Sequence, residues 1–278
     1  MNSGIKASLG LNRRLLFLFP YIFIAILLVF LPIILIIVNS VIHIADPAFD
    51  SFKLVKDSKT WTKIWRSLFI GIISALLCLI IGLPYAYFVA RSKNRIMPIY
   101  AMSLILSPLV IFTIAKIYAV RGFFLTLVSK ENDLNAIWFM IFGLTYLNLP
   151  YMIMPLYSVF RDMPENIIEA SHDLGNGPVR TLFRVILPYS SKAILSGLGI
   201  IFLSSATNFV ISDKLLPDGS QHQLIGTVIN NYTNPANQYE VSIGTTLVIV
   251  VSIIFIGTFA LISFLPRVFK RRRRARYE

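Results

Sequence analysis

The chain has 278 residues, of which 56% are hydrophobic and 14% are charged, and its formal net charge is +13. This composition is too apolar for a soluble globular domain of that length and indicates a protein that spans a membrane. Much of the positive charge follows the last apolar run, at residues 270–276, where basic residues act as a cytoplasmic anchor beside anionic lipid. That placement disfavours a nucleic-acid partner.

Six apolar runs are each long enough to cross a bilayer core of about 30 Å. They predict transmembrane helices, in chain order, at residues 15–41, 67–90, 97–120, 136–160, 193–211 and 241–265. The first run is much longer than a signal-peptide core and lacks a convincing cleavage site, so we expect it to be retained as a helix. The predicted fold class is therefore an all-α polytopic membrane protein of about six transmembrane helices.

Lysine and arginine are distributed unevenly over the segments between these helices. The two tails, the turn 91–95 and the loop 161–192 together hold more than twice as many as the segments on the opposite side. Because short cytoplasmic loops are enriched in basic residues, both termini are predicted to be cytoplasmic. We expect residues 1–66 to hold the first helix and an external loop, and residues 266–278 to form a basic cytoplasmic tail.

The sequence lacks the residue patterns that several kinds of chemical site require. Cys78 is the single cysteine, and the three histidines are scattered along the chain at His43, His172 and His222. No metal site, cofactor or catalytic residue is therefore expected. No acidic residue lies in the middle of an apolar run, as a proton relay would need, and no phosphate-binding Gly-x-x-x-x-Gly-Lys-Ser/Thr loop is present. The chain is predicted not to be an enzyme.

Lys116 falls inside the third predicted helix, about one turn from its outer end. A lysine there can extend its side chain to the membrane interface, so a structural role and a role in a substrate path both remain open. Prolines within the predicted helices can kink them where neighbouring helices satisfy the freed carbonyl groups. They are Pro20, Pro32, Pro84, Pro108, Pro150 and Pro155.

The loop that follows the fourth predicted helix reads as two short helices. Asp162 and Glu165 are spaced as in a capping box, with Pro164 in the first turn, so a helix is predicted to begin there. Gly175 is expected to end it in the left-handed conformation. A second helix is predicted to open with Pro178 in its first turn.

Apolar side chains are interspersed with charged ones along this loop. They are Ile167, Ile168, Leu174, Leu182 and Phe183. A solvated linker is the alternative, but a short, capped loop with an exposed apolar surface is typical of a docking site for a partner protein.

The same loop resembles the EAA signature of permease subunits of bacterial ATP-binding-cassette importers. That signature is Glu-Ala-Ala, three residues, Gly, nine residues, Ile, any residue, Leu-Pro. Here it reads Glu169-Ala170-Ser171, three residues, Gly175, nine residues, Val185, Ile186, Leu187-Pro188. Ser171 replaces the second Ala and Val185 replaces Ile, and both replacements are mild changes in volume.

The resemblance implies a type I importer permease fold, with residues 67–265 as the permease core and residues 162–188 as a cytoplasmic coupling loop. In that family the loop inserts into a groove on a separate ATP-binding subunit, which hydrolyses the ATP. The coupling residues implied are Glu169, Ala170, Ser171, Gly175, Leu187 and Pro188. The implied partners are the ATP-binding subunits, a second homologous permease and an extracytoplasmic substrate-binding protein, in a bacterial cell membrane.

A narrower resemblance, from about residue 67 to the C-terminus, is to the B-type spermidine/putrescine permease subunits. It rests on residues 149–158, 172–175 and 210–213, and it implies a polyamine cargo. Asp213, Tyr151 and Tyr118 are candidates for the substrate path, because carboxylates and aromatic faces attract cations. For the tyrosines, helix packing or an interface position is the alternative.

Two other functions remain open. The first is a permease of the same class for iron, sulfate, molybdate or phosphate, since those families share the loop. The second is a membrane channel, which would conduct without ATP or partner subunits.

Overall fold

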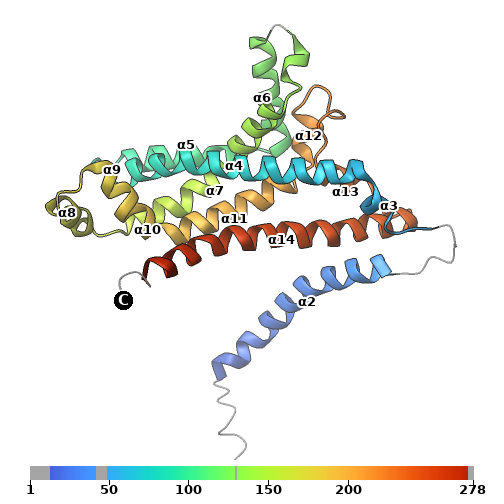
Figure 1. Cartoon of the computed structure of the whole chain (residues 1–278), viewed down its shortest axis with the longest axis horizontal. Coiled ribbons are helices and arrows are strands. Elements are labelled where there is room, and N and C mark those ends of the chain that lie inside the picture. Colours follow the sequence, from blue (N-terminus) through green and yellow to red (C-terminus); the bar gives the residue numbers. More distant parts are fainter. Residues whose placement is uncertain (1–12, 42–48, 129, 275–278) are drawn as a thin grey trace, which may run out of the picture.

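The structure is a computed structural model that describes residues 13–41, 49–128 and 130–274 (Figure 1). Within those residues every regular element is helical. Four helices are each long and apolar enough to cross a membrane, and they are α2 (Arg13–Val41), α4 (Ser58–Ala90), α7 (Ile137–Arg161) and α14 (Gln238–Arg274). Two further spans are bent pairs of helices, which brings the total to as many as six. The predicted all-α polytopic fold is confirmed.

The third span is broken, although the sequence predicts one helix over residues 97–120. Helix α5 (Met97–Val110) meets α6 (Thr113–Leu127) at an angle of 104°. Ile111 and Phe112 between them adopt extended backbone, with ψ of 139° and 133°. Pro108 lies in the last turn of α5, where its ring and missing N–H group weaken the helix next to the break. Figure 1 shows α6 rising away from the layer formed by α4 and α5.

The fifth span also differs from its prediction over residues 193–211. Helix α11 (Ser191–Ala206) ends five residues early, because Asn208 Oδ1 accepts a hydrogen bond from Ile211 N at 2.9 Å and starts a new helix. The remaining short elements are α3 (Lys53–Lys56), a 3₁₀ turn (Glu131–Leu134), α8 (Glu165–Asp173), α9 (Pro178–Thr181), a π turn (Leu182–Ile186), α10 (Leu187–Tyr189), α12 (Val210–Lys214) and α13 (Ile225–Asn231).

Helix α4 begins nine residues before the predicted start at residue 67. Asp57 is its N-cap, and its side chain accepts a hydrogen bond from Lys59 N at 3.1 Å. Thr60 and Ile64 in the first two turns are buried, so packing stabilises a stretch that its polar composition marked as a loop.

Helices α4, α7 and α11 form the centre of the bundle. Small residues let them approach closely, as is usual between membrane helices. A Cβ atom on Gly71 would lie 3.0 Å from Ala206 Cβ, and one on Gly197 would lie 2.8 Å from Met152 Sδ. Met152 and Cys78 are fully buried in the resulting core.

A buried amide joins α7 to α11. Asn148 Nδ2 donates to Ser205 Oγ at 3.1 Å, and Ser204 Oγ donates to Asn148 Oδ1 at 3.0 Å. Asn148 Nδ2 also donates to Leu144 O within its own helix, so the amide is satisfied away from water. Such contacts hold membrane helices together where the hydrophobic effect does not.

Helix α2 lies beside α14 and apart from the rest of the bundle (Figure 1). None of its side chains in the range Leu18–Val41 is buried, and an 18-residue window within that range has a mean hydropathy of 3.3. A helix that is apolar on every face has a surface suited to hydrocarbon.

Candidate functional site

The loop of residues 162–188 begins differently from the capping box that the sequence suggested. Helix α8 starts at Glu165 with Pro164 as its N-cap, and no side chain caps it. Asp162 instead ends α7 as its C-cap. Pro164 disfavours helical backbone at the residue before it, Met163, so a helix starting at Asp162 could not pass through that position. The predicted capping box is therefore wrong.

Gly175 ends α8 as predicted. It has a φ of 76° and is the only described residue with positive φ. Gly175 N donates to His172 O at 2.8 Å, and Asn176 N donates to Ser171 O at 3.1 Å. This pair of bonds is a Schellman motif, which satisfies the last carbonyl groups of the helix and needs glycine at the turn.

A hydroxyl pair connects α8 to α9. Ser171 Oγ and Thr181 Oγ1 lie 3.0 Å apart, with 4% and 1% of these residues exposed. Ser171 occupies the position where the EAA signature has alanine. Sequence reasoning treated it as a small change in volume and missed the hydrogen bond, because nothing local links residues ten positions apart.

The loop presents an exposed surface, which we call the docking surface. Its members are Glu169, Ala170, Leu174, Val179 and Phe183, and the last three are 82%, 66% and 63% exposed. The sequence also expected Ile167, Ile168 and Leu182 to be exposed. They are half-buried against the bundle core instead, so they anchor the loop.

The loop is attached to the membrane helices at two points. Arg91, the C-cap of α4, donates from Nη2 to Met163 O at 2.7 Å, and Met163 is 2% exposed. At the other end, half-buried Leu187 and exposed Pro188 lie in α10, which turns by 72° into α11. The loop is therefore joined to α4 by a hydrogen bond and to α11 by the chain itself. The sequence showed Arg91 only as one of the basic residues in the turn 91–95, and it gave no sign of this hydrogen bond.

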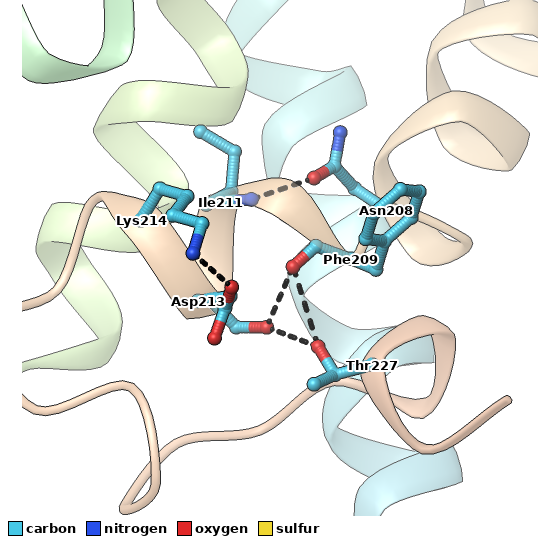
Figure 2. A network of polar contacts seen from close by, with 7 residues as sticks. Asn208, Phe209, Ile211, Asp213, Lys214 and Thr227 are labelled. Carbon is cyan, nitrogen blue, oxygen red and sulfur yellow. Dashed lines mark hydrogen bonds and ion pairs between the residues drawn. The ribbon is translucent and has the colours of Figure 1, made fainter. Parts of the chain in front are cut away.

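At the opposite end of the bundle, Asp213 lies in α12 and is half-exposed (Figure 2). Its Oδ2 is 2.8 Å from Lys214 Nζ. The hydrogen bond that Lys214 donates to Asp213 raises the pKa of Lys214, so the lysine stays charged at neutral pH and neutralises the carboxylate. The carboxylate of Asp213 is thus already paired with the ammonium group of Lys214.

Buried hydroxyl groups fix the position of α12. Ser212 Oγ and Thr227 Oγ1 are 2.7 Å apart, which ties α12 to α13, and Thr227 Oγ1 also donates to Phe209 O (Figure 2). Ser67 Oγ of α4 accepts from Ile225 N at 2.9 Å. The carboxylate of Asp213 is therefore presented from a rigid support.

The structure brings two of the three substrate-path candidates onto neighbouring elements. Tyr118 lies on α6, which contacts α12, and it is 49% exposed. Tyr151 is 45% exposed on α7, fourteen residues from the start of that helix and therefore about 20 Å along it.

Among the described residues, no group of three or more His, Cys, Asp or Glu could hold a metal ion. His43 lies outside the described residues.

Comparison with known proteins gives one family. The family model described as "Binding-protein-dependent transport system inner membrane component" matches residues 78–275. The spermidine/putrescine transport system permease protein PotB of Escherichia coli is 30% identical, over 73% of this chain and 80% of the relative. The PotB homolog of Mycoplasma pneumoniae is 28% identical, over 66% and 68%. The resemblance read from the loop is confirmed.

Two solved structures share the fold. One is a bacterial ABC transporter that imports the acidic polysaccharide alginate, with a TM-score of 0.59, 17% identity and coverage of 97% of this chain and 98% of that chain. The other is the MetNI methionine ABC transporter, with a TM-score of 0.55, 17% identity and coverage of 73% and 94%. At this identity the likeness concerns the fold alone, and it agrees with the permease fold expected from the sequence.

Proposed function

This chain belongs to the family of inner-membrane components of binding-protein-dependent transport systems, and from that premise we propose that it imports the polyamines spermidine and putrescine. The observation that supports polyamines as the substrate is the match, over 73% of the chain, to relatives named for spermidine/putrescine transport. The chain is a permease subunit and not an enzyme, and its family implies ATP-binding and substrate-binding partners. A second homologous permease completes the pore in this proposal.

The proposed orientation places both termini in the cytoplasm of a bacterial cell. Figure 1 shows α8 and the C-terminal end of α14 at one end of the bundle, and α3 and α13 at the other. The basic turn after α4 and the basic C-terminal end of α14 lie at the same end as α8. Cytoplasmic segments are enriched in Lys and Arg, which supports this side as the inner one. Residues 67–265 form the permease core in this proposal.

The docking surface receives the ATP-binding subunit. Its apolar members Leu174, Val179 and Phe183 would be buried on association, and Glu169 beside them adds charge complementarity. The Schellman turn at Gly175 and the hydroxyl pair between α8 and α9 make the loop a stiff unit. Closure of the ATP-binding subunits would then push α8 and move α4 and α11 through the two attachment points.

Asp213 offers a place where a polyamine enters. A polyamine carries several ammonium groups, each of which can replace the ammonium of Lys214 on the carboxylate of Asp213. Such an exchange of one cation for another is nearly balanced, so the contact would be weak and reversible. A weak contact suits a path through which cargo must leave as well as enter.

The cargo is tested by uptake of labelled spermidine and putrescine into proteoliposomes that hold the assembled transporter and its binding protein. We expect uptake that requires ATP and that excess sulfate, molybdate, phosphate or iron leaves unchanged. An assembly that hydrolyses ATP but takes up no polyamine would agree with an importer and contradict polyamines as its substrate. Uptake without ATP would indicate a channel instead.

A further inference from the structure

Lys116 is a lysine whose side chain is largely buried but whose ammonium group stays accessible. It lies in the first turn of α6, directly after the 104° break, and is 7% exposed. The sequence left a structural role at the membrane interface and a role in a substrate path both open for this lysine. Among the described residues, its ammonium group makes no hydrogen bond or ion pair. An accessible ammonium group beside apolar walls can bind an anionic headgroup.

The side chain lines a pocket between α6 and α7. The pocket has a volume of about 400 Å³, within the range of sites that bind small molecules. Its walls include Ile111, Ala115, Phe123, Phe142 and Tyr146, so that Lys116 and Tyr146 are the only lining residues with a polar side-chain group. The pocket begins at the N-terminus of α6, which has no side-chain cap and therefore carries partial positive charge.

Exposed aromatic side chains surround the pocket. Trp138, near the start of α7, is 50% exposed, and tryptophan at the end of a membrane helix marks the interface. Phe142 lies one turn further in and is 42% exposed, and Phe123 across the pocket is 61% exposed. The pocket therefore combines a cation at its inner wall with an apolar rim open to the surroundings.

We propose that this pocket binds an anionic phospholipid, with the phosphate at Lys116 and an acyl chain along Phe123 and Phe142. A negatively charged headgroup complements the ammonium and the N-terminus of α6, and a hydrocarbon chain covers the exposed rings. A cationic cargo would be repelled by Lys116, so the pocket is separate from the polyamine path. The bound lipid fills the angle between α6 and α7 and holds α6 in place.

The proposal is tested on the purified assembled transporter, stripped of lipid and placed in nanodiscs of phosphatidylcholine with a minor fraction of phosphatidylglycerol. Lipid retained by the protein is counted by native mass spectrometry. We expect phosphatidylglycerol to be retained selectively by the wild type and by Lys116→Arg. In Lys116→Met, which removes the charge but keeps an unbranched side chain one atom shorter, the preference should fall about tenfold. The exposed lysine Lys59 supplies the control, since Lys59→Gln should retain the wild-type preference.

Three results would overturn the proposal. The first is equal retention by wild type and Lys116→Met, as expected if Lys116 instead pairs with a carboxylate of the second permease. The second is a loss of preference in Lys59→Gln as large as in Lys116→Met, which would indicate general surface charge. The third is stabilisation of the delipidated protein by inorganic phosphate as strong as that by phosphatidylglycerol, which would show that the acyl chain has no part.

Discussion

The two ends of the bundle hold their functional residues in different ways. At the end with α8, a Schellman turn and one hydroxyl pair support a surface on which Leu174 is 82% exposed. At the other end, Asp213 stands on α12, which buried hydroxyl contacts join to α13. The first arrangement leaves apolar groups for a partner protein to cover, and the second keeps a paired carboxylate in water. Under the proposed function, the end with α8 is therefore suited to lasting contact with a partner and the end with α12 to brief contact with cargo.

The largest effect is expected at the link between the loop and α4. Arg91→Met removes the charged hydrogen bond to Met163 O, a loss worth about 2 kcal/mol. The assembled transporter should still hydrolyse ATP, but the spermidine imported per ATP should fall about tenfold. Lys93→Met in the same turn removes the same charge from an exposed position and should leave that ratio unchanged. Equal ratios for the two variants would remove Arg91 from the coupling route.

The next effect is expected at the glycine turn. Gly175→Val forces a β-branched residue into left-handed backbone, at a cost of about 1–2 kcal/mol. Spermidine uptake in proteoliposomes should fall by about fivefold to tenfold. Gly177→Val is the matched control, because Gly177 has a φ of −68° and both positions have open space for a Cβ atom. A similar loss in both variants would point to bulk on the loop rather than to the turn.

A smaller effect is expected at the hydroxyl pair. Ser171→Ala restores the residue of the EAA signature but leaves Thr181 Oγ1 buried without its partner, which should destabilise the loop by about 1 kcal/mol. Adding Thr181→Val should recover most of that loss, because both polar groups are then gone. Thermal unfolding of the purified chain measures both. An additive loss in the double variant would show that the two hydroxyl groups do not depend on each other.

The smallest effect is expected at the entry end. Asp213→Asn should slow spermidine uptake about twofold, and Lys214→Gln should speed it by a similar factor, since exposed ion pairs are weak. Initial uptake rates at low spermidine concentration measure the difference. Asp50→Asn alters another exposed pair, with Lys56 at 2.6 Å, and should change nothing. Rates that shift in the same direction for Asp213→Asn and Lys214→Gln would contradict the exchange of cations.

The sequence predicts those features of the fold that depend on residues close together in the chain. The first, fourth and sixth spans begin within a few residues of their predicted starts, because their apolar length alone specifies them. The turn at Gly175 and the start of α9 at Pro178 follow equally from single residues whose backbone preferences are strong. The spacing of the loop residues also identified the family.

Contacts between distant segments could not be predicted in this way. Arg91 and Met163 are 72 residues apart, and neither position has a local signal for their hydrogen bond. Pro108 lies beside a break while Pro84 lies inside an unbroken helix, so proline alone does not locate a bend. Packing between helices decides which proline ends a helix, and it also decides that Lys116 is buried.

Docking of the ATP-binding subunit on the loop is tested most directly by labelling a cysteine placed there. Cys78 is the single native cysteine and is buried, so Ala170→Cys supplies one exposed thiol. A maleimide should react with it in the isolated chain and fail to react once the ATP-binding subunits are assembled. Lys59→Cys, at the far end of the bundle, should react in both. Undiminished labelling at position 170 in an assembly that imports spermidine would contradict coupling through this surface.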